Sequence, residues 1–546
     1  MKRALLALTL LVLAACSTQT KPSAPPPAPT AGPGATPTPG VLMRTDPTVV
    51  EETDTYVIRR YKKSEYRRVD DRHFRIPIFA QPVEFFKEDD EYYYTSSPKP
   101  IPEEIELKRR IAEEAPRTPP SPAARPKAAG QPTSTDVTLA DFADLLPARV
   151  AGRLRLEKVT NTGLPVHGMW RASFVLADAN GDGIPDIVAP PSRIGDGQLH
   201  IWLGDGKGRF EAWPVTYTLA GKPMDRFSID YGAVAVGDID GDGKLDVVSA
   251  SHGTGLVSLF GDGKGNFEVV RAGLPQRDYS SQAVILLDAN GDGKLDIVAS
   301  RDNASMANGE SVDRTQVRVY VFLGRDKGWE LKKDGIIGGF YSNSLNAWDY
   351  DRDGKKDVLT GSHYTGALTL LWRNVGDGTF TPVQFPEIEP YAYHFSATPG
   401  TFGKDHAAAF LDGYSMQANV PDSTRASGLT LYVYGAGGWT KHRVWRKKDF
   451  NGYLFAAAMG DLDGDGLDDL VFADNETKRL RVFFQQPDGT FVEAAEAEEP
   501  ALDSQGQTVR LADLDRDGRL DIVLSKTVGS GSPNEPGGWD VYLNRR

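Results

Sequence analysis

The segment Asp238-Ile239-Asp240-Gly241-Asp242-Gly243-Lys244-Leu245-Asp246 decides the fold. It places acids at positions 1, 3, 5 and 9 of a nine-residue loop and glycines at positions 4 and 6. Four carboxylates this close together repel one another at neutral pH unless a cation neutralises them. An all-oxygen donor set on a flexible loop suits Ca²⁺, and the carbonyl of Lys244 at position 7 adds another oxygen. The segment therefore predicts a calcium loop, in which Gly243 supplies the sharp turn.

The same pattern occurs five more times with the same spacing. Asp, Asn and Gly are common in turns, but unrelated turns would not repeat one spacing six times. Each copy has Asp at positions 1, 5 and 9 and Asp or Asn at position 3. The predicted ligands are Asp178, Asn180, Asp182 and Asp186; Asp238, Asp240, Asp242 and Asp246; Asp288, Asn290, Asp292 and Asp296; Asp349, Asp351, Asp353 and Asp357; Asp461, Asp463, Asp465 and Asp469; and Asp513, Asp515, Asp517 and Asp521. We expect about six Ca²⁺ ions with a structural role, because closed loops rigidify a fold without an open coordination position.

The residues around each loop predict strands. Position 12, where an EF-hand has a bidentate Glu, holds Ala189, Ser249 or Ala299 in the first three copies. Apolar and β-branched runs such as Ala233–Val236 precede the loops, and runs such as Asp246–Val248 follow them. Each loop is therefore expected to join two strands.

The spacing of the loops predicts a repeat architecture. The loops start at 178, 238, 288, 349, 461 and 513, so the steps are 50 to 61 residues except for one double step of 112. The missing copy falls near Phe402–Asp412, which is strand-like but lacks the alternating acids. A period of this length with several strands per unit is typical of a β-propeller. We therefore predict an all-β, seven-bladed propeller over residues 150–546, with calcium loops in six blades.

A second recurring motif supports this prediction and brings a family resemblance. Tight glycine-rich turns ending in an aromatic residue are expected to join the third and outer fourth strands of a blade, at Gly204–Phe210, Gly261–Phe267, Gly376–Phe380 and Pro487–Phe491. Together with the acidic loops, these turns resemble the FG-GAP/VCBS repeat family, as in integrin α-subunit heads, and the resemblance covers residues 152–546.

The two ends of this region are expected to close the ring. Arg153–Thr160 reads as an outer fourth strand, whereas Gly538–Leu543 near the C-terminus reads as a third strand with no fourth after it. The first segment would complete the last blade and remove an exposed edge.

The N-terminus predicts export and lipid anchoring. Residues 1–15 read as a signal peptide, with Lys2 and Arg3 before the apolar run Ala4–Val12. Leu13-Ala14-Ala15-Cys16 resembles the bacterial lipobox, which implies a lipoprotein lipidated at Cys16, and Ser17 in place of Asp implies the outer membrane, on a side left open. Cys16 is the only cysteine, so no disulfide within the chain can stabilise the fold.

Three segments are predicted between the signal and the propeller. Residues 16–40 are the lipidated Cys and a Pro-rich tether. Residues 41–115 form a small, partly ordered accessory segment, either a weakly ordered spacer or a docking region, with strands expected at Tyr56–Tyr61 and Phe74–Phe79 and a helix at Glu103–Ala115. Residues 116–149 form a linker.

The face opposite the calcium loops is the predicted ligand face. Loops that leave each second strand and loops that enter each inner strand reach that face, and they carry aromatic and polar side chains that suit a sugar or a peptide. The alternative is that each ring only covers the end of a blade. The candidate ligand-binding residues are His252, Asp302, His363, Asn475, Tyr231, Tyr279, Tyr341, Tyr393 and Tyr453.

These features predict an envelope-anchored, calcium-stabilised lipoprotein that binds a carbohydrate or protein partner. The formal net charge of −13 argues against nucleic acid as partner. One alternative is a calcium-dependent polysaccharide lyase or hydrolase, with His394, His406 and Asp405 as catalytic candidates, although no nucleophile elbow, zinc motif or phosphate loop is present. Another alternative is a scaffold of an envelope complex that docks through residues 41–115.

Overall fold

The computed structural model describes strands between 48 and 98 and most of residues 144–546. The gaps in the second region are 172, 194–195, 225–226, 253, 277–278, 302–317, 327, 336, 339–343, 363–368, 387–393, 395, 415–425, 449–455 and 528–536. All elements in the described part are strands. No helix among these residues has the length and apolar character needed to cross a membrane.

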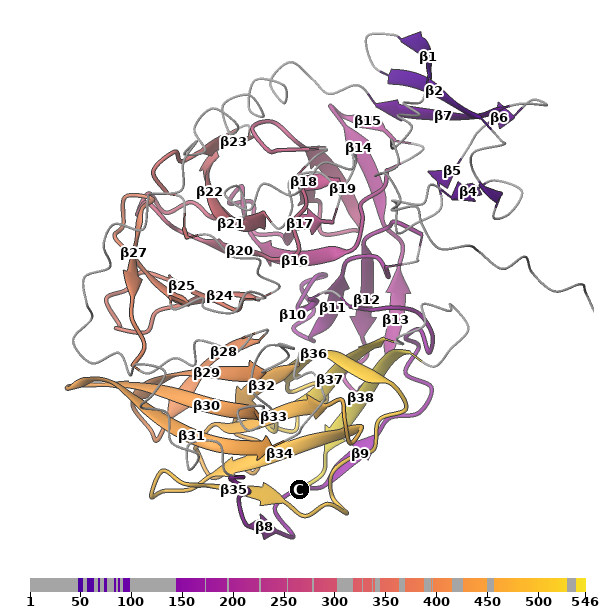
Figure 1. The fold of residues 1–546 in the computed structure, drawn as a ribbon. Helices are drawn as coiled ribbons and strands as arrows, with labels where there is room; N and C mark the ends of the chain where they lie inside the picture. The colour runs from indigo at the N-terminus through magenta and orange to yellow at the C-terminus, as the bar shows by residue number, and fades with distance from the viewer. Residues whose placement is uncertain are drawn as a thin grey trace, which may run out of the picture. The chain divides into compact units, whose positions relative to one another are not determined.

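Residues 144–546 form a seven-bladed β-propeller, whose sheets surround a common centre in Figure 1. The first blade has β10 (Val175–Ala177), β11 (Asp186–Ala189), β12 (His200–Gly204) and β13 (Phe210–Trp213). The second has β16 (Gly232–Gly237), β17 (Asp246–Ser251), β18 (Gly255–Gly261) and β19 (Asn266–Val270), and β14 (Thr216–Leu219) and β15 (Lys222–Pro223) extend its outer edge. The third has β20 (Val284–Leu287), β21 (Asp296–Arg301), β22 (Arg318–Arg325) and β23 (Gly328–Leu331).

The next two blades have four strands each. The fourth has β24 (Leu345–Trp348), β25 (Asp357–Thr360), β26 (Leu371–Asn374) and β27 (Phe380–Val383). The fifth has β28 (Ala397–Phe402), β29 (His406–Tyr414), β30 (Ala426–Gly435) and β31 (Gly438–Lys448). This fifth blade is the one predicted to lack an acidic loop, and only Gly403, Lys404 and Asp405 join its first two strands.

The last two blades incorporate strands from the start of the propeller. The sixth has β32 (Ala457–Gly460), β33 (Asp469–Asp474), β34 (Arg479–Gln485) and β35 (Phe491–Ala494), and β8 (Arg149–Val150) pairs with β35 in parallel. The seventh has β36 (Gln505–Ala512), β37 (Asp521–Thr527) and β38 (Gly538–Asn544). Its fourth strand is β9 (Leu156–Lys158), which lies antiparallel to β38 and confirms the predicted ring closure.

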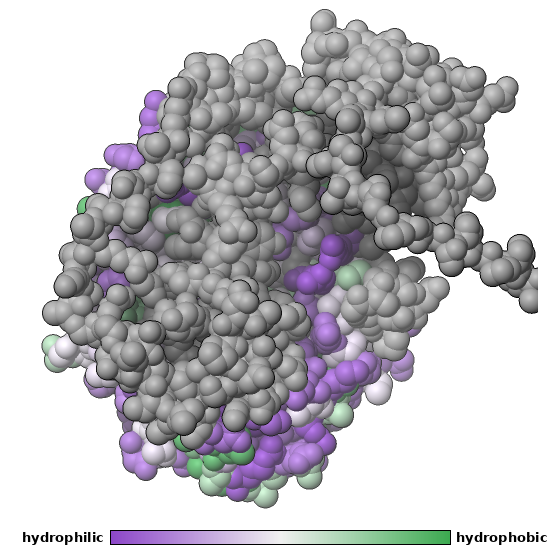
Figure 2. Space-filling view, in the orientation of Figure 1, coloured by the Kyte–Doolittle hydropathy of each residue, from purple (hydrophilic) through white to green (hydrophobic). Residues whose placement is uncertain are grey.

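The hydrophobic core lies between neighbouring blades. In one cluster, Ala233 and Val248 of the second blade pack with Ile297 and Phe322 of the third, and all four are nearly or fully buried. Small residues on the inner strands and large ones further out allow flat sheets to converge toward the centre. In the view of Figure 2, the coloured residues of the surface are mostly hydrophilic.

The N-terminal region contains two small sheets. One sheet consists of β1 (Thr48–Glu52), β2 (Tyr56–Lys62), β7 (Tyr92–Pro98) and β6 (Lys87–Glu88), and the other of β3 (Arg67–Arg68), β4 (His73–Arg75) and β5 (Val83–Glu84). The strand expected at Tyr56–Tyr61 matches β2, and the strand expected from Phe74 onward overlaps β4. The signal peptide, Cys16, the tether and the expected helix Glu103–Ala115 lie outside the described residues.

Ring closure depends on a close approach at Gly538, where β38 begins. A Cβ at Gly538 would meet the carbonyl oxygen of Pro165 at 2.0 Å, and φ there is +72°. We expect Gly538→Ala to lower the free energy of unfolding by about 2 kcal/mol or more. The strain of a positive φ and the steric overlap of the new Cβ with Pro165 both contribute to this loss. Gly152→Ala is the control, because Gly152 has a similar φ of +80° but a Cβ there would have no described atom within 4 Å. Thermal melts should show a clearly larger loss for Gly538→Ala, and equal losses would contradict the close approach.

Candidate functional site

Each acidic loop is held in shape by its own position-1 carboxylate. In the loop that starts at Asp238, the backbone N–H of Gly241 donates to Asp238 Oδ1 at 2.8 Å and that of Gly243 donates to Oδ2 at 2.9 Å. The loop at Asp461 has the same arrangement, with Gly464 and Gly466 as donors. The loops are therefore folded by local hydrogen bonds that the Asp-x-Asp-Gly-Asp-Gly spacing provides.

The position-9 carboxylate has a structural role that the sequence analysis did not assign. In the third blade, Asp296 Oδ2 accepts the N–H of Ala289 in its own loop at 2.8 Å, and Asp296 Oδ1 accepts the N–H of Gly324 on β22 at 2.7 Å. The other five position-9 residues bridge loop and third strand in the same way, and all six are fully buried: Asp186, Asp246, Asp296, Asp357, Asp469 and Asp521.

Burial makes these carboxylates costly to ionise. Burial raises the pKa of Asp246 to about 6 and that of Asp469 to about 8, and repulsion from acids of the same loop adds to both shifts. A cation close to such a loop would stabilise the ionised form.

The acidic loops bring together groups that could hold a metal ion. In four loops, three carboxylates have oxygens within 4.8 Å of one another: Asp238, Asp240 and Asp246; Asp349, Asp351 and Asp353; Asp461, Asp463 and Asp465; and Asp513, Asp515 and Asp521. Asp515 Oδ1 is buried and has no hydrogen-bond partner among the described residues. This donor set of carboxylate oxygens fits Ca²⁺.

Among the described residues, arginine side chains from outside the loops pair with the carboxylates of three of them. Arg373 contacts Asp351 at 2.6 Å and Asp353 at 2.8 Å, and Arg153 contacts Asp465 at 2.7 Å. Arg545 pairs with an acid of the last loop, Asp515. These guanidinium groups neutralise part of the acidic charge, so the loops differ in how much positive charge they still require.

A cavity opens at the other end of the inner strands. Gly232 at the start of β16 lines this cavity, whereas Gly237 at the end of the strand leads into an acidic loop. The cavity has a volume of about 690 Å³, and all seven blades contribute residues to it. Its size lies within the range of about 300–1,000 Å³ that is typical of ligand sites.

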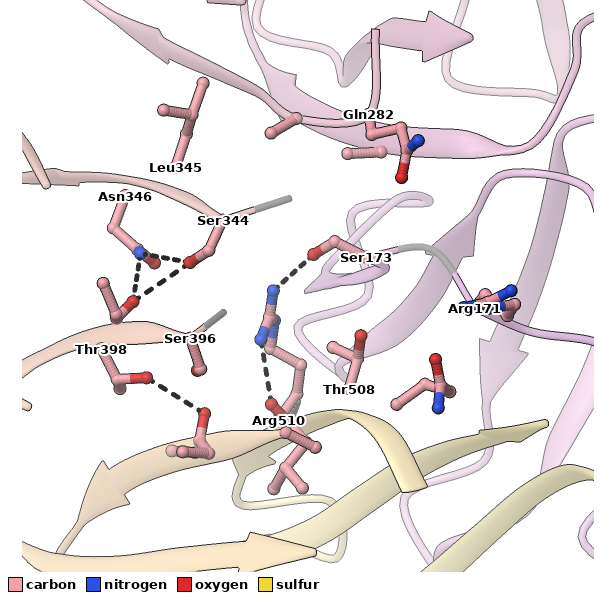
Figure 3. A pocket seen from close by; sticks show the side chains of 18 of the residues that line it. Arg171, Ser173, Gln282, Ser344, Leu345, Asn346, Ser396, Thr398, Thr508 and Arg510 are labelled. Atoms are coloured by element: carbon pink, nitrogen blue, oxygen red, sulfur yellow. Dashed lines mark hydrogen bonds between the residues drawn. The ribbon is translucent and has the colours of Figure 1, made fainter. Parts of the chain in front are cut away.

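We call this space, which all seven blades line, the axial cavity. Its polar lining comes largely from residues near the starts of the inner strands. Figure 3 shows Arg510 on β36 between Ser173 and the start of β28. The polar lining residues labelled there are Arg171, Ser173, Gln282, Ser344, Asn346, Ser396, Thr398, Thr508 and Arg510.

Two of the predicted ligand-face residues line this cavity. The ring of His252 lies 4.9 Å from that of Tyr231, and His252 Nδ1 is 2.8 Å from Ser280 Oγ and 3.1 Å from Gln282 Nε2. Burial lowers the pKa of His252 to about 4, and the positive charge of Arg193 adds to the shift. His252 is therefore neutral at physiological pH and can offer a hydrogen bond.

The other predicted ligand-face residues lie elsewhere. Tyr279 is buried with the guanidinium of Arg301 5.6 Å from its ring centre, and Asn475 exchanges hydrogen bonds with the backbone of Gly506. Both therefore contribute to packing. The remaining candidates lie outside the described residues: Asp302, His363, Tyr341, Tyr393 and Tyr453.

The catalytic candidates of the enzyme alternative do not come together. His394 is buried just before β28, where its backbone pairs with Ser362. Asp405 and His406 are exposed at the opposite end of the same strand. A six-residue strand separates the two ends by roughly 20 Å.

Sequence reasoning missed Arg510, although a signal was present. Arg510 stands three residues before the first acid of its loop, and the corresponding residues of three other blades are the apolar Ala235, Ile285 and Ala458. A charged residue at a strand position that is apolar in these other blades indicates a polar cavity beside that strand.

The fold and the arrangement of these loops define the class, a β-propeller with acidic loops at one end of its inner strands. A model described as an FG-GAP-like repeat matches residues 178–249, 238–299 and 461–524, so the chain contains three FG-GAP-like repeats, which support the FG-GAP repeat family. Comparison with curated proteins finds no match. Among solved structures, a crystal structure of BBS1N in complex with ARL6DN, soaked with mercury, is similar with a TM-score of 0.42 and 12% identity over 72% of this chain and 97% of that chain.

The bridging role of the position-9 residues is separable from metal binding. In the presence of a chelator, we expect Asp296→Ala to lower the free energy of unfolding by about 2–4 kcal/mol, because two buried N–H groups lose their acceptor. Asp326→Ala, at an exposed acid near the same loop, should change it by less than about 0.5 kcal/mol. Thermal melts in chelator compare the two, and an unchanged melt for Asp296→Ala would contradict the bridge.

Proposed function

We propose that the protein is an envelope-anchored lipoprotein whose calcium-stabilised propeller binds a carbohydrate or protein partner at the axial cavity. The observation that carries this proposal is a polar cavity of about 690 Å³ at the opposite end of the inner strands from the acidic loops. The propeller fold supports a ligand-binding or scaffold role, and the position of the cavity favours ligand binding.

Anchoring is proposed from the sequence. The lipobox-like segment before Cys16 would place a lipid at the N-terminus, and the Pro-rich residues that follow would keep the propeller away from the membrane surface. The outer membrane is the proposed location.

Ca²⁺ is proposed as the resident ion of the acidic loops. The carboxylates of Asp238, Asp240 and Asp246 would supply hard oxygen ligands, and the bound ion would stabilise the fold by neutralising them. In the loops that Arg373, Arg153 and Arg545 contact, the ion competes with a guanidinium group for the same oxygens. We therefore expect weaker Ca²⁺ binding there.

Chelation provides the test of the calcium proposal. We expect EDTA to lower the melting temperature and excess Ca²⁺ to restore it, because an ion at 100 times its Kd adds about 2.7 kcal/mol per site. Asp240→Asn should remove about one Ca²⁺ per chain in elemental analysis, since a closed site loses a charged ligand. Asp262→Asn, in the turn between β18 and β19, should retain the full number. A chain that contains no Ca²⁺ and melts unchanged in EDTA would contradict the proposal.

Capture of a partner tests the proposed binding face. Full-length protein should retain an envelope protein or a glycan, and Gln282→Ala in the cavity should weaken that binding by roughly three- to tenfold, since one lost hydrogen bond of a neutral amide contributes about 0.5–1.5 kcal/mol. Glu211→Ala, an exposed residue on the outer strand β13, should leave binding unchanged. Equal binding by both variants would show that the partner binds outside the cavity and would contradict the proposed binding site.

A further inference from the structure

The axial cavity has a positively charged lining in the part of the chain that the structure describes. Arg171, Arg193 and Arg510 line it, and none of the described lining residues is Asp or Glu. This composition is opposite in sign to the whole chain, whose formal net charge is −13. The cavity is therefore a local basic site in an acidic protein.

Arg510 makes hydrogen bonds only to neutral oxygens in the described part of the chain. Its Nε donates to the carbonyl of Phe174 at 3.1 Å, Nη1 to the carbonyl of Val509 at 2.9 Å and Nη2 to Ser173 Oγ at 2.6 Å. Figure 3 shows the guanidinium group between Ser173 and Ser396. Burial lowers the pKa of Arg510 to about 10, so the group is still charged at neutral pH.

Two buried cations of the propeller, Lys526 and Arg481, have carboxylate partners. Lys526 lies 2.9 Å from Asp540 and 2.8 Å from Asp503. Arg481 pairs with Asp474 at 3.3 Å and also with Glu493. Partial withdrawal of a charge from water without such a partner is costly, and that cost is offset where an external ligand supplies the negative charge. Arg510 differs from both side chains in this respect.

The two other arginines extend the positive field across the cavity. The positive charges of Arg193 and Arg171 add to the lowering of the pKa of His252. Asp230 is a nearby acid among the described residues, and burial raises its pKa to about 7 although Arg193 opposes the shift. Asp230 therefore neutralises only part of the positive charge at neutral pH.

The neutral side chains around Arg510 suit a hydroxylated ligand. Ser173, Ser396 and Thr508 offer hydroxyl groups, and Gln282 and Asn346 offer amides. Such groups exchange hydrogen bonds with the hydroxyls of a sugar ring, whereas a guanidinium group matches a carboxylate or a phosphate with two parallel bonds.

We propose that the axial cavity binds an acidic saccharide unit, with Arg510 paired to its carboxylate or phosphate and the neighbouring hydroxyls and amides bound to its ring. This inference rests on the proposed function, because it uses the same face, and it names the chemical class of the ligand.

Calorimetry with the full-length protein tests the site with three probes: D-glucuronate, D-glucose 6-phosphate and D-glucose. At least one anionic probe should bind, glucose should bind at least about tenfold more weakly, and added NaCl should weaken the anionic probe. Glucuronate binding identifies a carboxylate site and glucose 6-phosphate binding a phosphate site, and each supports the proposal. Inorganic phosphate bound as tightly as the anionic sugars would overturn the saccharide assignment.

Variants locate the site. Arg510→Gln should weaken the anionic probe at least about tenfold, because the probe loses a hydrogen bond between two charged groups. Arg171→Gln, at an exposed side chain whose loss leaves the core intact, should also weaken it. Arg325→Gln is the control, since Arg325 lies at the end of β22 and pairs with Glu330. If Arg510→Gln has a lowered melting temperature, its loss of binding is not informative, and the affinity of Arg171→Gln is used instead. An affinity of Arg171→Gln equal to that of the wild type would overturn the proposal.

The outcomes separate this inference from the proposed function. If an envelope partner is captured equally by the wild type and Arg510→Gln, and no anionic probe binds, the acidic-saccharide inference fails while partner binding stands. If an anionic sugar binds in an Arg510-dependent way but no envelope partner is captured, envelope partner binding fails while the saccharide site stands.

Discussion

The propeller depends on a buried carboxylate that joins three parts of a blade. At position 9 of every acidic loop, Asp ends the loop and begins the second strand, and its two oxygens accept backbone N–H groups from the loop and the third strand. Each oxygen satisfies a donor that would otherwise be buried without a partner. One residue type therefore sets the loop conformation, the strand start and the spacing of neighbouring strands.

This arrangement separates two kinds of surface. The acidic loops follow the ends of the inner strands, so negative charge gathers where those strands finish. The beginnings of the same strands surround the axial cavity, whose charged lining in the described part of the chain is basic. Because every inner strand runs in the same sense about the centre, a repeated sequence motif yields two chemically different ends. The inner strands vary between blades, as Ala235, Asn346 and Arg510 show at equivalent positions three residues before the first acid of their loops.

The fifth blade shows what the acidic loop contributes and what can replace it. Its first two strands are joined by a short turn, and β29, β30 and β31 are longer than the corresponding strands of the other blades. Longer strands add ladder hydrogen bonds and burial, as Trp445 and Leu431 illustrate within the core. More extensive strand pairing thus stabilises this blade without the bridging carboxylate.

The sequence by itself determined the all-β class, the number of blades, the positions of the six loops and the closing strand, because these follow from local patterns that repeat with a constant period. It also located Tyr231 and His252 on the cavity face. Only the tertiary structure showed that Asp296 and its equivalents bridge two strands, that Tyr279 and Asn475 contribute to packing, and that Arg171, Arg193 and Arg510 meet in one cavity. These properties depend on which side chains from distant blades converge on the axis, and a period along the chain does not encode such convergence.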